Sequence, residues 1–278
     1  MEILKDATHL ELQQMLELFP VSNVKQGWPD LTGEKGAVCD QIATKHDLKL
    51  IAAFIDEHIG SCRQHVYIFS ANEDTVVPKT LGDSELIATA EGCYSTFIAL
   101  KDIDVVMTTT LERKALRFLW PIRVQMFQRH LVVRFVTLEK NIAAHVSGPY
   151  LTEDKGLDEK TLLSSITLPS SDIHKGIKKI WHDEFMDCPR LKYIDPDSTT
   201  ETAMKEARGI RKNNSELYEK VKTLEIVRAT FFMEQSPTKT SLHGFAVEPS
   251  RGYLAISRYS ETKGDSDYAI AEIIKHNQ

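Results

Sequence analysis

A continuous run of basic side chains lies in the middle of a chain that is acidic overall. No aspartate or glutamate occurs between Arg113 and Leu138, although the formal net charge of the whole chain is -6. From Leu119 to Lys140, apolar residues alternate with arginine and glutamine, a pattern typical of a half-buried strand. Guanidinium and amide groups contact phosphates and base edges, and an exposed phenylalanine can stack on a base. The run therefore predicts a nucleic-acid contact made by Arg117, Arg123, Arg129 and Arg134.

A second basic run, MKEARGIRKNN, lies in a segment that we predict to be helical from residue 200 to 222. On such a helix Lys205, Arg208 and Lys212 share one face, with Arg211 beside them, and they would extend the same contact. Both runs have a plainer interpretation as solvated surface. Arginines on a sheet face discourage aggregation, and exposed helices commonly carry ion pairs four residues apart.

Metal-dependent cleavage of phosphodiesters is the alternative chemistry. Nucleases of that kind gather two or three carboxylates around the metal, and candidates here are Asp102, Asp104, Glu139 and the acids within 183–187. A restriction-type core needs an acid followed by Glu-x-Lys on neighbouring strands. Glu139 and Lys140 are consecutive, so on a strand they would point to opposite faces. This spacing breaks the pattern and disfavours the nuclease hypothesis.

Other catalytic or metal-binding motifs are missing from the sequence or have a simpler explanation. His58, Cys62 and His65 share a face of a predicted helix, but Cys62 lies on the apolar stripe, where a packed cysteine is the ordinary interpretation. The chain contains no G-x-S-x-G elbow and no glycine-rich phosphate loop. We therefore expect no metal site and no cofactor, and we lean towards a non-enzymatic protein.

The N-terminal part of the chain predicts a small helical bundle. Apolar residues recur at helical spacing in 7–19, near 34–45 and in 47–66, and Thr8-His-Leu-Glu11 resembles a capping box. Asp47 is placed to cap the third helix. Residues 71–84 contain turn-forming residues and a proline, as expected of a linker. We predict an acidic helical interaction module at 1–75.

The rest of the chain, 76–278, predicts an antiparallel α+β domain. The segments ELIATA, CYSTFIAL and DVVMTTT are short β-type runs, and the basic segment splits at Gln128-Arg129-His130 into a hairpin. A long polar connection at 146–171 precedes two helices, at 171–186 and 200–222. LEIVRATFFMEQ, LHGFAVEP, GYLAISRYS and DYAIAEII then predict further strands. Runs of strands, then helices, then strands favour α+β over a parallel nucleotide-binding fold.

Charge and cysteine content suggest where the protein works and with what. Residues 1–75 hold 12 acidic and 6 basic side chains, so this part carries the entire net charge of -6. No run of about 18 apolar residues occurs, and the N-terminus lacks the features of a secretory signal. The four cysteines are scattered without C-x-x-C spacing, which favours reduced thiols. These features predict an intracellular, cytoplasmic protein with no membrane segment.

Together these patterns predict an α+β protein with an N-terminal three-helix module and a larger antiparallel-sheet domain that carries two packed helices. The expected function is nucleic-acid binding, chiefly to phosphates, with a protein partner at residues 1–75. The alternatives are a metal-dependent nuclease, or an assembly subunit of a multi-protein complex of the kind found in defence or mobile-element systems. The sequence does not determine the type of nucleic acid or the oligomeric state.

Overall fold

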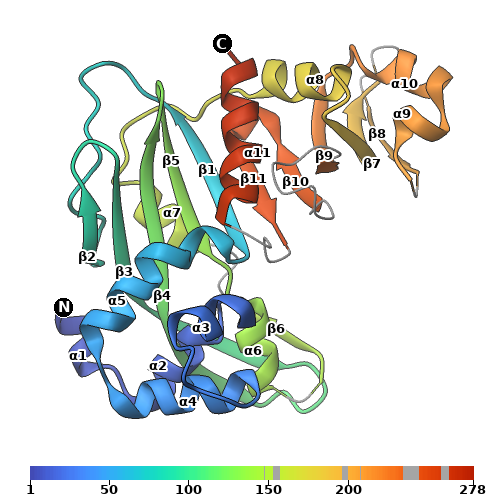
Figure 1. The fold of residues 1–278 in the computed structure, drawn as a ribbon. Helices are drawn as coiled ribbons and strands as arrows, with labels where there is room; N and C mark the ends of the chain where they lie inside the picture. The colour runs from blue at the N-terminus through green and yellow to red at the C-terminus, as the bar shows by residue number, and fades with distance from the viewer. Residues whose placement is uncertain (147, 153–156, 196–199, 207, 234–243, 258–262) are drawn as a thin grey trace. The chain divides into compact units, whose positions relative to one another are not determined.

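The computed structural model describes residues 1–146, 148–152, 157–195, 200–206, 208–233, 244–257 and 263–278 (Figure 1). Eleven α-helices and eleven strands are assigned within these ranges, and the eight strand pairings whose register is defined are antiparallel, so the predicted α+β class is confirmed. The chain forms two compact units. The first comprises 1–62, 76–125 and 134–167, and the second, here called the C-terminal unit, comprises 63–75, 126–133 and 168–278. The units thus divide the chain differently from the predicted boundary at residue 75.

The helices are α1 (Glu2–Asp6), α2 (His9–Leu16), α3 (Val21–Gly27), α4 (Lys35–Lys45), α5 (Leu48–His58), α6 (Glu139–His145), α7 (Leu157–Leu163), α8 (His174–His182), α9 (Ile210–Asn213), α10 (Ser215–Val221) and α11 (Lys263–His276). The strands are β1 (Gln64–Ser70), β2 (Glu85–Ala90), β3 (Tyr94–Met107), β4 (Arg113–Phe127), β5 (His130–Val136), β6 (Tyr150–Thr152), β7 (Met186–Ile194), β8 (Glu201–Lys205), β9 (Ile226–Met233), β10 (Gly244–Glu248) and β11 (Tyr253–Ile256). Two 3₁₀ turns, η1 (Ile59–Ser61) and η2 (Pro249–Arg251), complete the elements.

Local capping signals explain the helices of the first unit. The predicted capping box of α2 is present, since the Thr8 hydroxyl accepts from the backbone N–H of Glu11, whose carboxylate accepts from the Thr8 N–H. Asp47 caps α5 as predicted, by accepting from the backbone N–H of Leu50 at 3.1 Å. The predicted third helix is too long, however. It ends at His58, and Gln64–Ser70 forms β1.

The sheet of the first unit is built around two long strands. β3 pairs with β4 in continuous register from Tyr94↔Gln125 to Val106↔Arg113, so the two predicted short runs within β3 form one strand. β2 and β6 pair with β3, and β4 leads through the predicted turn at Gln128 into β5, of which residues 134–136 belong to this unit. Phe118 to Val124 are buried without alternation, as are Leu131 to Val136. Both faces of these strands are therefore covered.

In the C-terminal unit the strand order is β1-β11-β10-β9-β7-β8. Alternate residues of each strand, such as Val66, Leu254, Val247, Phe231 and Leu191, join one hydrophobic core. The same core contains the apolar stripes of α8, α10 and α11, including the fully buried Trp181 of α8. One face of this sheet thus packs under helices, and the intervening residues point to the opposite face.

Two elements of the C-terminal unit differ from the prediction. The segment 200–222 is not one helix: Glu201–Lys205 pairs with β7, and two short helices follow Gly209, whose φ of 101° interrupts regular structure. DYAIAEII belongs to α11, because Ile270, Ile273 and Ile274 are buried at helical spacing. In addition, the polar connection at 146–171 contains β6 and α7, while residues 147 and 153–156 lie outside the described ranges.

Candidate nucleic-acid interface

Arg123, predicted to face solvent, is buried within the first unit at 3% exposure. Its Nη2 donates to Asp56 Oδ1 at 2.5 Å, and its Nε donates to the Thr96 hydroxyl oxygen at 3.1 Å. The Thr96 and Tyr94 hydroxyls also donate to the Asp56 carboxylate, at 2.6 and 2.9 Å, and the guanidinium lies 4.5 Å from the Tyr94 ring centre. The hydrogen bond to Asp56 and partial burial raise the pKa of Tyr94. Arg123 therefore joins α5 to the sheet, and its predicted solvent-facing position is wrong.

Arg134, the second arginine placed outward by the sequence, is also buried, at 1% exposure. Residues on both sides of it, from Leu131 to Val136, are buried as well. The alternation of polar and apolar residues correctly indicates a strand, but it does not reveal that elements cover the second face. The predicted solvent-facing row of guanidiniums on this hairpin is therefore absent at Arg123 and Arg134.

Arg117 and Arg129 do reach the surface, and each meets a carboxylate. Arg117 Nε donates to Asp102 Oδ1 at 2.7 Å, and Arg129 Nη2 lies 3.3 Å from Glu73 Oε1. Exposed pairs of this kind contribute little to stability and are screened by salt. Because Arg117 belongs to the first unit and Arg129 to the C-terminal unit, the described geometry does not join them into one surface.

The second predicted run is divided among three elements. Lys205 ends β8, Arg208 precedes α9, and both are exposed, as is Lys212. Arg211 is largely buried and its Nη1 lies 3.3 Å from Glu184 Oε1, so it does not join the others at the surface. The predicted shared helical face is therefore wrong, since Lys205 lies on a strand.

A buried carboxylate sets the start of α9. Asp187, with no exposed surface, accepts from the backbone N–H groups of Cys188, Arg211 and Lys212 and from the Trp181 indole, at 2.7–3.2 Å. Four donors stabilise the charge in the interior. Asp187, one of the acids that the sequence suggested for a nuclease, therefore has a structural role in the fold.

Lys205 belongs to a larger surface that the sequence did not predict. Its cross-strand neighbour on β7 is Arg190, and the row continues through Thr230, Ala246, Ala255 and His65. A second row contains Ala203, Lys192, Arg228, Glu248, Tyr253 and Tyr67. Cross-strand neighbours point to the same side of a sheet, and here that side is opposite the hydrophobic core. We call these two rows the basic-aromatic face.

Positive charge predominates at the β8-β7-β9 end of the basic-aromatic face. Arg190, Lys205 and Arg228 are exposed, and within the described residues Arg190 and Lys205 have no ion-pair partner. Lys192 pairs with Glu201, and Arg228 lies 3.9 Å from Glu248. Such solvent-exposed pairs are weak, so a phosphate can compete with the carboxylates for these cations.

Aromatic rings occupy the β11-β1 end of the same face. The Tyr253 ring centre lies 5.1 Å from that of Tyr67 and 5.7 Å from that of His65, and all three side chains are half-buried. The alternation of His65 and Tyr67 with Val66 and Ile68 was a period-two signal for this strand. The strand was missed because its first residues, 64–66, fell inside the helix predicted at 47–66.

The carboxylates proposed for a nuclease are not brought together. No group of three or more histidine, cysteine, aspartate or glutamate side chains with metal-binding geometry occurs among the described residues. Asp102 is paired with Arg117, and Asp183 lies 2.8 Å from the Lys179 ammonium. Cys62 is fully buried, and burial raises its thiol pKa above the usual range. The described geometry thus offers no metal-binding cluster for hydrolysis.

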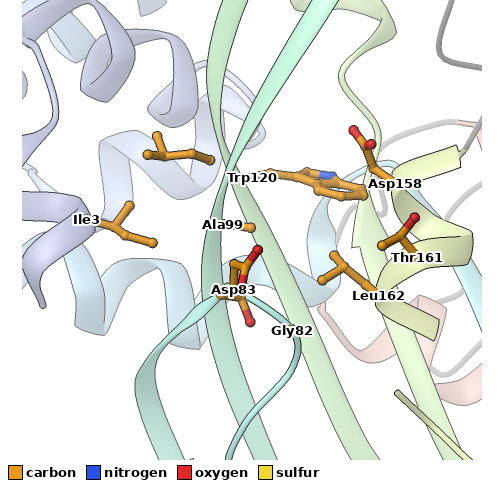
Figure 2. A pocket seen from close by; sticks show the side chains of 10 residues that line it. Ile3, Gly82, Asp83, Ala99, Trp120, Asp158, Thr161 and Leu162 are labelled. Carbon is orange, nitrogen blue, oxygen red and sulfur yellow. The ribbon is translucent and has the colours of Figure 1, made fainter. Parts of the chain in front are cut away.

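A cavity of about 330 Å³ lies in the first unit beside β3 (Figure 2). Trp120 and Leu162 contribute apolar surface, and Asp83 and Asp158 contribute carboxylates. The Lys101 ammonium lies 3.5 Å from Asp158 and 4.2 Å from the centre of the Trp120 ring. Two carboxylates at the cavity disfavour a phosphate there, so we do not assign it to a nucleic-acid interface.

Comparisons with known proteins do not indicate a family. No protein-family model matches the chain, and no curated protein matches it. Within the described ranges, no helix has both the length and the apolar character needed to cross a bilayer.

Proposed function

We propose that this chain is a non-enzymatic nucleic-acid-binding protein and that its basic-aromatic face makes the contact. The proposal keeps the function predicted from the sequence and moves its surface from the β4–β5 hairpin to the sheet of the C-terminal unit. The observation that carries it is the cross-strand pairing of Arg190 with Lys205, next to Lys192 and Arg228 on the same face. Four cations within two rows of one sheet can contact successive phosphates of a polyanion.

Charge reversal tests the surface directly. Fluorescence anisotropy at about 50 mM salt would measure the affinity for labelled DNA and RNA oligonucleotides of the wild type and of the Arg190→Glu/Lys205→Glu variant. We expect that variant to lose more than about ten-fold in affinity, because two phosphate contacts become repulsive. The matched control, Arg113→Glu/Arg117→Glu, changes the net charge equally on the first unit and should bind nearly as the wild type does. Equal losses in both variants would contradict the assignment of the surface.

The nuclease alternative is tested in the same samples. Incubation of the oligonucleotides with the protein and Mg²⁺ or Mn²⁺ should leave them intact, because the proposal assigns no metal-dependent step. Metal-dependent cleavage that purifies with the protein would overturn the non-enzymatic part of the proposal.

A protein partner at residues 1–75 is also part of the proposal. It is supported by the acidic charge of this segment and by the exposed side chains of Leu10 in α2 and Leu50 in α5, at 54% and 44% exposure. An intracellular, cytoplasmic location is likewise proposed, and the four free cysteines support it. Affinity capture with Leu10→Lys/Leu50→Lys as the comparison would test the partner. Recovery of the same stoichiometric partner by both forms would contradict this surface.

A further inference from the structure

We infer that the nucleic acid bound on the basic-aromatic face is single-stranded, an inference that rests on the proposed function. The reason is that the face presents rings as well as charges. Tyr67, Tyr253 and His65 lie on adjacent strands with ring centres 5.1 and 5.7 Å apart. Aromatic side chains on a sheet face bind bases by stacking, which requires bases whose flat surfaces are accessible.

The dimensions of the face prevent it from entering the major groove of a B-form duplex. Six strands, β8-β7-β9-β10-β11-β1, at about 4.8 Å spacing make the face about 24 Å wide. The major groove of B-form DNA is about 12 Å wide, so a sheet presented by its face does not enter it. A straight B-form duplex therefore offers chiefly its phosphates to this surface, because its bases are stacked and paired. A single strand can offer its phosphates to the basic end and its bases to the rings.

The middle of the face lets one strand reach both ends. In the row from Lys205 to His65, the residues between the basic and aromatic ends are Thr230, Ala246 and Ala255. Because these side chains are short, they project little from the sheet, so a nucleotide chain can lie close to the backbone of the sheet between the two ends. At the stacked spacing of about 3.4 Å, the width of the face corresponds to about seven nucleotides, and fewer when the strand is extended.

In the second row, Glu248 lies between the two ends, and its carboxylate lies 2.9 Å from Arg251 Nη1 and 3.9 Å from Arg228 Nη1. Two cations beside one carboxylate leave this part of the face with net positive charge. A phosphate crossing the centre of the face is therefore not repelled by Glu248.

The first test uses the wild-type protein and three ligands of one length: a 12-nucleotide single strand, its 12-base-pair duplex, and an abasic strand that keeps the phosphates. We expect the single strand to bind more than about ten-fold tighter than either of the others, because only it offers accessible bases. Equal binding of the single and abasic strands would overturn the inference and leave the proposed phosphate contact intact. Absence of binding to all three at low salt would remove the proposed function itself.

The second test removes the rings. Tyr67→Leu/Tyr253→Leu keeps apolar side chains on the face, and we expect it to lose about ten- to hundred-fold in affinity for the single strand while duplex affinity is unchanged. Tyr150→Leu, on β6 of the first unit, is the matched control and should bind as the wild type does. A ring variant that keeps both its circular dichroism spectrum and its single-strand preference would overturn the inference.

Discussion

Replacing Arg123 with methionine separates a structural arginine from a ligand-binding one. The substitution retains an unbranched apolar side chain but leaves the Asp56 carboxylate without its cation, 2.5 Å away in the wild type. Removing one partner of a buried ion pair costs about 3–5 kcal/mol. The Asp56 side chain is 19% exposed and keeps the hydroxyl donors of Thr96 and Tyr94, so the lower end of that range applies. We expect the free energy of unfolding to fall by about 3 kcal/mol.

Urea unfolding followed by tryptophan fluorescence measures this change, since Trp28 and Trp120 both lie in the first unit. Adding Asp56→Leu to the variant should recover much of the loss, because no buried carboxylate is then left unpaired. Arg117→Met, which breaks an exposed pair, is the control and should leave the free energy of unfolding unchanged. An Arg123→Met variant that has wild-type stability but binds nucleic acid more weakly would contradict the structural role of Arg123, because Arg123 would then be a contact residue.

Three further outcomes are expected. In urea unfolding, Gly209→Ala should destabilise the protein by about 2 kcal/mol more than Gly92→Ala. Both glycines have a positive φ, but only at Gly209 would a Cβ lie 2.2 Å from a buried carboxylate oxygen, that of Asp187. In native protein a thiol reagent should label Cys93 alone of the four cysteines, and labelling of more would contradict the burial of the others. Burial raises the pKa of Asp172, but hydrogen bonds from His174 outweigh burial and lower this pKa below its usual value. The stability that the ionised carboxylate contributes is therefore present above the unfolded-state pKa of about 4, and it is lost as the pH falls through the lower folded-state pKa. Urea unfolding at pH 3 to 6 should accordingly show the advantage of the wild type over Asp172→Asn shrinking below about pH 4.

Local signals made much of the first unit predictable. The capping box at Thr8 and the cap at Asp47 define helix starts from side chains within three residues, so α2 and α5 begin close to where the sequence places them. The sequence-based predictions fail where pairing with a distant segment of the chain determines the secondary structure. Val66 also fits the helical stripe predicted for 47–66, but Gln64–Ser70 pairs with β11 from the far end of the chain. Likewise, Glu201–Lys205 is a strand because β7 lies beside it.

The candidate site was harder to predict than the fold. The spacing of Arg123 and Arg134 correctly indicated strands, but burial of both depends on what covers the second face of the hairpin. Arg190 and Lys205 are neighbours only through the β7–β8 pairing, and one of them lay in a predicted helix. A sequence pattern indicates which side of a strand a residue occupies. Predicting which residues form one surface also requires knowing which strands are adjacent in the sheet.

The salt dependence of single-strand binding tests the central claim most directly. If Arg190, Lys192, Lys205 and Arg228 neutralise phosphates, the logarithm of the association constant should fall against the logarithm of salt concentration with a slope of about -2 to -3. The Arg190→Gln/Lys205→Gln variant, which removes two of these charges, should reduce the magnitude of that slope by about 1.4. A slope that is the same in the wild type and in this variant, or no binding at the lowest salt, would contradict the account.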